Sequence, residues 1–193
     1  MLRFNSGTVS SDDVGLFSTP LADIEFGPSP MTSSAVTPSD EFPVSRVTVE
    51  QVARYQFEVS YPGTSLRSTT VDEAPPVGTG NGPDPAQALA GAVGHCLSST
   101  LFNTLERSHV RTTPIRTSVT VTFGRNEKGR KRVAALSARI ECGPLEESDR
   151  ARFERCVEIF EDYCTVTGSV RQGVSVHTEV RPLEDAASPR VWP

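Results

Sequence analysis

The sequence lacks long hydrophobic runs of the kind that cross membranes or direct export. A bilayer span takes about 20 consecutive apolar residues. The nearest candidate, residues 85–105, has no charge but contains seven polar side chains. The first residues of the chain also lack the apolar run of a signal peptide. We therefore expect neither a membrane span nor an export signal.

Aromatic residues are few, at 7% of the chain, and the net charge of −5 is concentrated at one end. Residues 1–44 contain one base and six acids, whereas the remaining residues carry 18 bases and 18 acids. Nucleic-acid binding requires a basic surface. This balance argues against a nucleic-acid partner, and the acidic composition belongs to the N-terminal segment alone.

The ends of the chain have no helical or alternating apolar pattern. Within residues 1–44, 20 positions are Ser, Thr, Pro or Gly, a composition typical of disorder. We predict a disordered acidic tail there and a second short tail over residues 183–193. Residues 45–182 then form one domain, long enough to bury a core without a metal or disulfide.

Alternation of apolar and polar side chains predicts strands on both sides of a long uncharged segment. A loop rich in proline and glycine, residues 72–85, precedes that segment. The strands are expected within residues 47–53, 57–61, 66–71, 115–123, 133–141 and 174–180.

Two main helices complete the expected fold. The first begins at Asp84 and Pro85, a capping residue followed by proline, and runs to about Arg107. Because this helix is uncharged, we expect it to be buried on all sides, in a core or at an oligomer seam. The second begins near Ser148, and a short helical turn then ends at Gly173. Its apolar face comprises Phe153, Cys156, Val157, Phe160 and Cys164.

The order of these elements is βββ-α-ββ-α-β, and it predicts an α+β fold in which antiparallel strands pack on two central helices. A helix that needs apolar cover on every side also predicts that the chain forms a dimer.

The four cysteines are the side chains most capable of chemistry. Without an export signal, we expect free thiols and a cytoplasmic location. Cys96 lies within the first helix beside His95, and Cys164 lies beside a turn that contains glycine. Cys96 is either a buried inert thiol or a reactive one. A second thiol nearby could convert a sulfenic acid to a disulfide, but spacing alone does not bring Cys96 and Cys164 together.

The sequence has no recognisable metal or phosphate motif. It contains no CxxC or HxxxH pattern, and the adjacent residues His95 and Cys96 cannot face one site from a helix. The glycines of residues 78–82 lack the lysine and hydroxyl residue of a phosphate-binding loop. We therefore expect neither a metal nor a cofactor.

The chain contains two separated cysteine motifs. The first comprises residues 84–89 (DPAQAL) and 92–97 (AVGHCL), and the second comprises residues 161–167 (EDYCTVT) and 170–174 (VRQGV). With these two motifs in this order, the chain resembles the OsmC/Ohr superfamily of thiol-dependent hydroperoxide reductases. The likeness covers about residues 47–180 and includes the order of strands and helices. It implies an OsmC-like fold: an intertwined homodimer with two central helices and two sites at the subunit interface.

The resemblance also implies a reaction. An organic hydroperoxide would oxidise Cys96 to a sulfenic acid, and Cys164 would resolve it as a disulfide. A dithiol reductant would then restore both thiols. Active members of the superfamily hold the thiolate with an arginine from the first hairpin. Arg54 is the best match for that arginine, and Arg67 is the second.

One position departs from the family pattern. A glutamate normally follows the proline that opens the first helix, and this chain has Ala86 there. Asp72 and Glu73 are the nearby carboxylates that could substitute. Without a carboxylate to fix the guanidinium, we expect weaker or different peroxide chemistry. Three hypotheses therefore stay open: a peroxidase, a non-catalytic sensor of oxidants or electrophiles, and a module that binds a small apolar or sulfur-containing ligand.

Overall fold

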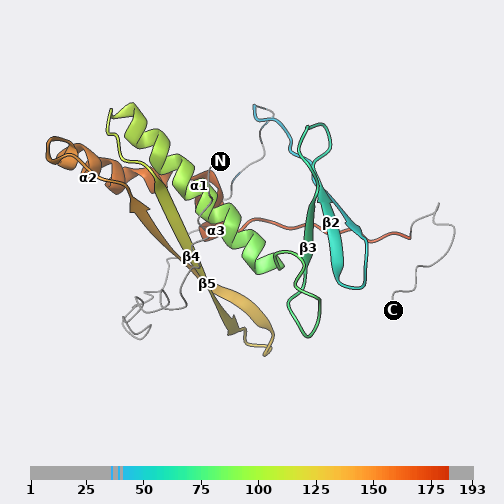
Figure 1. Ribbon diagram of the computed structural model, residues 1–193. Coiled ribbons are helices and arrows are strands. Elements are labelled where there is room, and N and C mark those ends of the chain that lie inside the picture. Colours follow the sequence, from blue (N-terminus) through green and yellow to red (C-terminus); the bar gives the residue numbers. More distant parts are fainter. Residues whose placement is uncertain (1–35, 37–38, 40, 183–193) are drawn as a thin grey trace, which may run out of the picture. The chain divides into compact units, whose positions relative to one another are not determined.

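The computed structural model describes Val36, Ser39 and residues 41–182 of the chain (Figure 1). The predicted tail over residues 1–44 lies outside the described residues except for these few positions. The predicted tail over residues 183–193 lies wholly outside them.

Three short antiparallel strands form the first sheet, in the order β1-β2-β3. β1 spans Thr48–Gln51, β2 spans Gln56–Ser60 and β3 spans Thr69–Asp72. Each lies within or close to a stretch where the alternating pattern predicted a strand. The turn between β1 and β2 is closed by backbone hydrogen bonds between Ala53 and Gln56.

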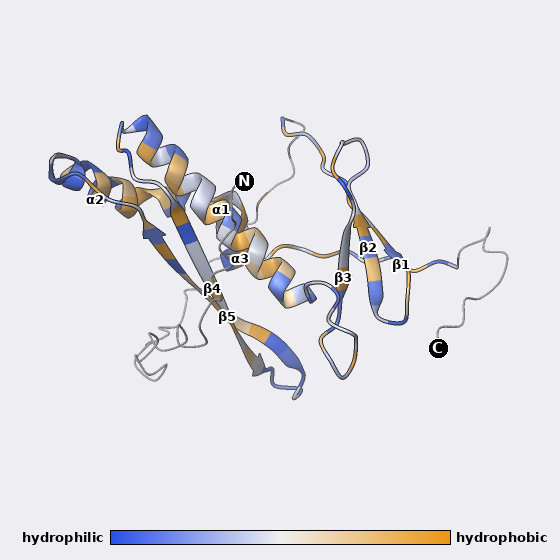
Figure 2. Cartoon of the chain, in the orientation of Figure 1, coloured by the Kyte–Doolittle hydropathy of each residue, from blue (hydrophilic) through white to orange (hydrophobic). Residues whose placement is uncertain are grey.

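The first sheet has one apolar face and one polar face. Val49 pairs with Val59, and Phe57 pairs with Val71. Since side chains alternate across a strand, these four lie on the same face, as the hydropathy colouring shows for β2 (Figure 2). Val49 nevertheless remains 57% exposed. Within the described chain, this apolar face is incompletely covered.

The long helix α1 spans Pro85–Arg107 and begins where the sequence predicted. Asp84 accepts a hydrogen bond from the backbone N–H of Gln87, and the Gln87 side chain accepts one from the N–H of Asp84. Pro85 occupies the first turn, where a missing N–H costs nothing. This capping box fixes the start of the helix that carries Cys96.

α1 packs along a long hairpin formed by β4, Ile115–Arg125, and β5, Lys131–Cys142 (Figure 1). Their register runs from the pair Ile115 and Cys142 to the hairpin end. Packing explains why α1 has a glycine at position 94. A Cβ atom on Gly94 would lie 3.0 Å from Val119 Cγ2. The helix therefore approaches β4 closely at this position.

The second helical region differs from its prediction. It consists of η2, Glu147–Asp149; α2, Arg150–Ile159; η3, Phe160–Tyr163; and α3, Thr165–Gln172. The prediction of one continuous helix to Cys164 was therefore wrong, because a 3₁₀ turn interrupts it. Of the predicted apolar face, Cys156, Phe160 and Cys164 are buried and Phe153 packs against the core, whereas Val157 is exposed. The helix end at Gly173 is confirmed, and its φ of 77° suits glycine.

Two further expectations need correction. The predicted last strand over residues 174–180 is absent: this segment forms no strand, and Val176 is 84% exposed. Alternation describes a strand's two faces but does not provide a pairing partner. The second expectation that needs correction is that α1 is buried on all sides. Within one chain its face bearing Gly91, His95 and Ser99 is exposed.

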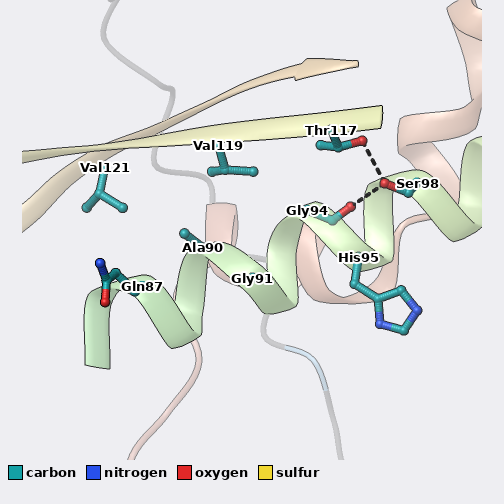
Figure 3. Close-up of a pocket in the computed structure, with 9 residues that line it drawn as sticks. All are labelled: Gln87, Ala90, Gly91, Gly94, His95, Ser98, Thr117, Val119 and Val121. Carbon is teal, nitrogen blue, oxygen red and sulfur yellow. Dashed lines mark hydrogen bonds between the residues drawn. The ribbon is translucent and has the colours of Figure 1, made fainter. Parts of the chain in front are cut away.

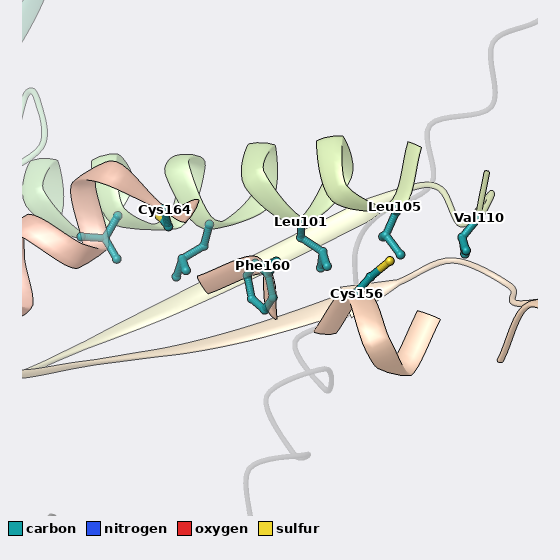
Figure 4. Close-up of a cluster of buried hydrophobic side chains, with 8 residues drawn as sticks. Leu101, Leu105, Val110, Cys156, Phe160 and Cys164 are labelled. Carbon is teal, nitrogen blue, oxygen red and sulfur yellow. The ribbon is translucent and has the colours of Figure 1, made fainter. Parts of the chain in front are cut away.

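The hydrophobic core lies between α1, the hairpin and the second helical region (Figure 4). Leu101 and Leu105 of α1 pack in the same cluster as Phe160 and the two buried cysteines. The predicted α+β fold is thus confirmed, with Val110 at one end of the buried cluster shown and Cys164 toward the other. The cluster comprises Val93, Leu97, Leu101, Leu105, Val110, Cys156, Phe160 and Cys164.

Candidate functional site

Two thiols from distant parts of the sequence lie next to each other, one in α1 and the other immediately before α3. Cys96 lies in the middle of α1, and Cys164 immediately precedes α3. Their Sγ atoms are 3.0 Å apart, and both residues are free thiols. A disulfide has a sulfur–sulfur length of about 2.05 Å. Closing the bond therefore requires the two sulfurs to move about 1 Å closer. Their spacing in the sequence alone did not establish that they meet.

The two sulfurs differ in burial. Cys164 is only 2% exposed and belongs to the hydrophobic core, whereas Cys96 is half-buried. A dissolved oxidant therefore reaches Cys96 more easily than Cys164. A buried thiol beside an accessible one is the arrangement needed to convert a sulfenic acid into a disulfide.

Hydroxyl groups surround the buried thiol. Thr167 Oγ1 lies 3.0 Å from Cys164 Sγ. Burial of the Cys164 thiol raises its pKa, but hydrogen bonds from Cys96, Thr167 and Thr100 outweigh this effect and place the pKa below its usual value. Sequence reasoning missed Thr167; its signal was a hydroxyl residue three positions after a cysteine at a helix start.

An open pocket of about 500 Å³, lined by apolar and polar side chains but by neither cysteine, lies between α1, β5 and α3. Leu89, Val93 and Leu97 line it, and Thr167 contributes to its wall. Glu161 and Arg171 also line it and form an ion pair with each other. Thr167 therefore lies between this pocket and the thiol pair.

The other two cysteines lie apart from this pair. Cys156 is buried in the core, with its Sγ 3.2 Å from Ser108 Oγ. Cys142 ends β5, and burial raises the pKa of its thiol. These positions fit structural roles.

The structure does not bring Arg54 to the thiol pair within one chain. Arg54 lies in the turn between β1 and β2 and helps line a hollow of about 340 Å³ together with Asp72. Its guanidinium lies 5.6 Å from the centre of the Tyr55 ring. Among the described residues, no hydrogen bond or ion pair joins Arg54 to Cys96. The second choice, Arg67, lies on an exposed loop.

The Asp72 carboxylate is committed to its own loop. It accepts hydrogen bonds from the backbone N–H groups of Glu73, Thr79 and Asn81, at 2.8, 3.1 and 3.3 Å, and from the Thr79 hydroxyl at 2.5 Å. Asp72 shares the hollow with Arg54 but forms no ion pair with it. Asp72 is therefore close to Arg54, the place that a substitute for the family glutamate requires. Its carboxylate oxygens, however, already accept hydrogen bonds from its own loop.

We expect Asp72→Asn to destabilise the fold in a pH-dependent way. The Thr79 hydroxyl is the main group that lowers the pKa of Asp72, with backbone N–H groups adding to it against an opposing effect of burial. The ionised carboxylate therefore stabilises the fold above its unfolded pKa of about 3.9, and this contribution is lost as pH falls through the lowered pKa. Urea unfolding should show a wild-type advantage at neutral pH that shrinks in acid. The exposed Asp162→Asn is the control, and a constant difference at every pH would contradict the assignment.

His95 lines a separate open groove between α1 and β4, with a volume of about 380 Å³ (Figure 3). The Ser98 hydroxyl donates to the carbonyl of Gly94, and its oxygen lies 2.6 Å from Thr117 Oγ1. Neither cysteine lines this groove. His95 thus points to a different surface of α1 from the one that meets Cys164.

Within residues 41–182 and the two isolated positions described, His, Cys, Asp and Glu side chains form no group of three or more that could hold a metal ion. The same residues include no helix with the length and apolar character needed to span a membrane.

The sequence matches the profile of the family described as OsmC-like protein over residues 78–179. This match covers more than half of the chain and includes both Cys96 and Cys164. The chain therefore belongs to the OsmC family. A search of curated proteins gave no match.

Solved structures support the same fold. The chain resembles an OsmC-like protein of unknown function from Vibrio cholerae, with a TM-score of 0.55 and 13% identity, over 66% of this chain and 94% of the other. A hypothetical protein from Aquifex aeolicus gives 0.53 and 21%, over 67% and 89% of the two chains. An OsmC-like protein from Mycoplasma pneumoniae gives 0.53 and 16%, over 67% and 88%. At these identities, the likeness establishes the fold alone.

Proposed function

We propose that this chain is a thiol-dependent peroxidase that reduces organic hydroperoxides. The observation that carries the proposal is the approach of Cys96 and Cys164, whose sulfurs lie 3.0 Å apart although 68 positions separate them in the sequence. The half-buried Cys96 is the proposed nucleophile, and the buried Cys164 is the proposed resolving thiol. Membership of the OsmC family supports this assignment.

The proposed reaction has two steps in the protein. The Cys96 thiolate attacks the terminal oxygen of the hydroperoxide, the O–O bond breaks, and Cys96 becomes a sulfenic acid. The alkoxide that leaves takes up the proton that the thiol lost on ionising and becomes the alcohol. The Cys164 thiolate then attacks the Cys96 sulfur and hydroxide leaves, which forms the disulfide. A dithiol supplies the two electrons and two protons that restore both thiols. A cytoplasmic location would provide such a reductant.

The pocket that shares Thr167 with the thiol pair supports a preference for organic peroxides over hydrogen peroxide. Its lining includes leucine and valine side chains from α1, and Thr167 connects its wall with Cys164. An alkyl or aryl group gains free energy by leaving water for such a surface. Hydrogen peroxide has no apolar part to bind there.

We also propose that the chain is a homodimer. The apolar face of the first sheet is incompletely covered within one chain, and the exposed face of α1 carries no charge from Ala88 to Asn103. Exposed apolar area of this kind indicates an interface. Such a dimer offers a route for Arg54 of one subunit to reach Cys96 of the other, where a guanidinium would stabilise the thiolate.

The dimer predicts opposite results for two neighbouring substitutions in β1. Val49→Asp places a charge on the apolar face and should weaken association by at least about tenfold, because a buried unpaired carboxylate is costly. Thr48→Asp lies on the opposite face and should leave association unchanged. Sedimentation tests both against the chain mass of 20.8 kDa. A wild-type chain that sediments as a monomer at micromolar concentration would refute the dimer.

One observation favours a second function, that of a redox or electrophile sensor. Ala86 replaces the glutamate of active relatives, and among the described residues no ion pair holds Arg54. A sensor would keep the thiol pair but react once rather than repeatedly. A module that binds a small apolar ligand is the third hypothesis, and it would keep its ligand in Cys96→Ser.

Consumption of cumene hydroperoxide in the presence of a dithiol separates these functions. The peroxidase predicts many turnovers per chain with the organic peroxide and fewer with hydrogen peroxide. Arg54→Ala should slow the reaction if that side chain stabilises the thiolate. A single oxidation per chain, with no further turnover when reductant is in excess, would favour the sensor and overturn the proposed peroxidase.

A further inference from the structure

The hydroxyl group of Thr167 is buried beside the sulfur of Cys164. Thr167 is 7% exposed and lies in the first turn of α3, three residues after Cys164. The Cys164 thiol donates a hydrogen bond to Thr167 Oγ1, at 3.0 Å. When Cys164 ionises, its sulfur can only accept, so the same pair is held together if the Thr167 hydroxyl becomes the donor. The family resemblance does not assign a role to this side chain.

We infer that Thr167 is a positioning residue for the resolving step, in which its hydroxyl donates a hydrogen bond to the sulfur of Cys164 while that sulfur attacks Cys96. This inference rests on the proposed peroxidase. The hydrogen bond would act twice. It would hold the sulfur within reach of Cys96, and it would stabilise the negative charge that the attack requires.

The electron and proton balance of the step leaves Thr167 unchanged. A bond forms between the sulfurs of Cys164 and Cys96, the sulfur–oxygen bond of the sulfenic acid breaks, and hydroxide leaves. The proton released by Cys164 combines with that hydroxide to give water. Thr167 keeps its own proton throughout and contributes only its hydrogen bond.

The surroundings of Cys164 show why this hydrogen bond matters. From α1, it faces the thiol of Cys96 and the hydroxyl of Thr100. Glu161 of η3 and Arg171 of α3 pair with each other and are partly exposed. Among the described residues, no charged side chain is among the groups that shift the pKa of Cys164. Hydroxyl and thiol donors must compensate for the burial of its charge.

Thr167→Val tests the inference because valine has nearly the same shape but no hydroxyl. Rapid mixing with one equivalent of peroxide separates oxidation of Cys96 from disulfide formation. Each unit by which the pKa of Cys164 rises lowers its thiolate fraction about tenfold, while the nucleophilicity of the thiolate rises about threefold. We therefore expect disulfide formation to be slower than in wild type at about pH 6, by about threefold for each unit of the rise, and to match or exceed the wild-type rate once both thiols are ionised, at about pH 10.

Two further variants control for structure. Thr165→Val makes the same chemical change on an exposed position of α3 and should leave both steps unchanged. Thr167→Ser keeps the hydroxyl and should restore the wild-type pH profile. Oxidation of Cys96 is measured as a separate phase in all three variants, so a change in the first step is distinguishable from a slow second step.

The outcomes separate this inference from the function on which it rests. If wild type forms the disulfide and Thr167→Val forms it with an identical pH profile, the role of Thr167 is overturned and the peroxidase stands. If Thr167→Val is slower by one factor at every pH and serine does not rescue it, Thr167 is merely structural. If peroxide leaves Cys96 of wild type unoxidised, the proposed function fails first, and the role fails with it.

Discussion

Replacing Cys96 with serine is expected to abolish turnover of organic hydroperoxides, by about a thousandfold or more. The serine hydroxyl is not ionised near neutral pH, so the nucleophile is lost while the shape of the side chain is kept. Cys96 is the half-buried member of the thiol pair, and Cys164 is too buried to replace it. Peroxide consumption with excess dithiol provides the measurement.

Two other cysteine variants serve as comparisons for Cys96→Ser. Cys142→Ser changes a thiol at the end of β5 and should keep activity within about twofold. Cys164→Ser should still allow Cys96 to be oxidised, and a sulfenic acid should then accumulate that a sulfenic-acid-specific probe labels. Undiminished turnover in Cys96→Ser would show that another group performs the reaction. Loss of turnover in Cys142→Ser would mean that general damage explains the effect.

Leu101→Ala is expected to cause the largest loss of stability, about 2–5 kcal/mol in the free energy of unfolding. Leu101 is 2% exposed and lies in the cluster that includes Phe160 and Cys164. Its truncation removes buried apolar surface and leaves a cavity between α1 and η3. Because Cys164 packs in the same cluster, we expect the thiol pair to become less well aligned as well.

Leu66→Ala is the matched control for this prediction. Leu66 is 65% exposed, in the loop between β2 and β3, so the same truncation should change stability by no more than about 0.5 kcal/mol. Urea unfolding at one fixed protein concentration measures both, because stability of a dimer depends on concentration. Equal losses in the two variants would contradict the position of the core.

The sequence predicted local structure well where a short-range signal exists. Asp84 and Pro85 marked the start of α1, and Gly173 marked the end of α3. These signals act through hydrogen bonds and φ angles within a few residues. The long hairpin was equally clear, because both of its strands alternate and face one helix.

Features that depend on contacts between residues far apart in the sequence were harder to predict from the sequence. The segment 174–180 alternates like a strand, but a strand needs a neighbour, and the described chain offers it none. The 3₁₀ turn over Phe160–Tyr163, which interrupts the predicted second helix, is likewise not revealed by the spacing of apolar residues. Thr167 was missed for the same reason: its role depends on the position of a sulfur, not on a pattern.

The thiol pair was predicted in part. Its members Cys96 and Cys164 came from the family resemblance, whereas their 3.0 Å approach came from the packing of η3 and α3 against α1. Arg54, from the same resemblance, has no contact with the pair within the described chain. A dimer is the arrangement that would reconcile its position with its expected role.

The most direct test of the account is to map the products of a reaction with one equivalent of organic hydroperoxide. Mass spectrometry of the digested protein should show a single linkage, between the peptides that contain Cys96 and Cys164, with one alcohol released per linkage. The intact chain should lose two hydrogens and gain no oxygen. A chain that instead accumulates sulfinic acid on Cys96, or links either thiol to Cys142 or Cys156, would contradict the proposed mechanism.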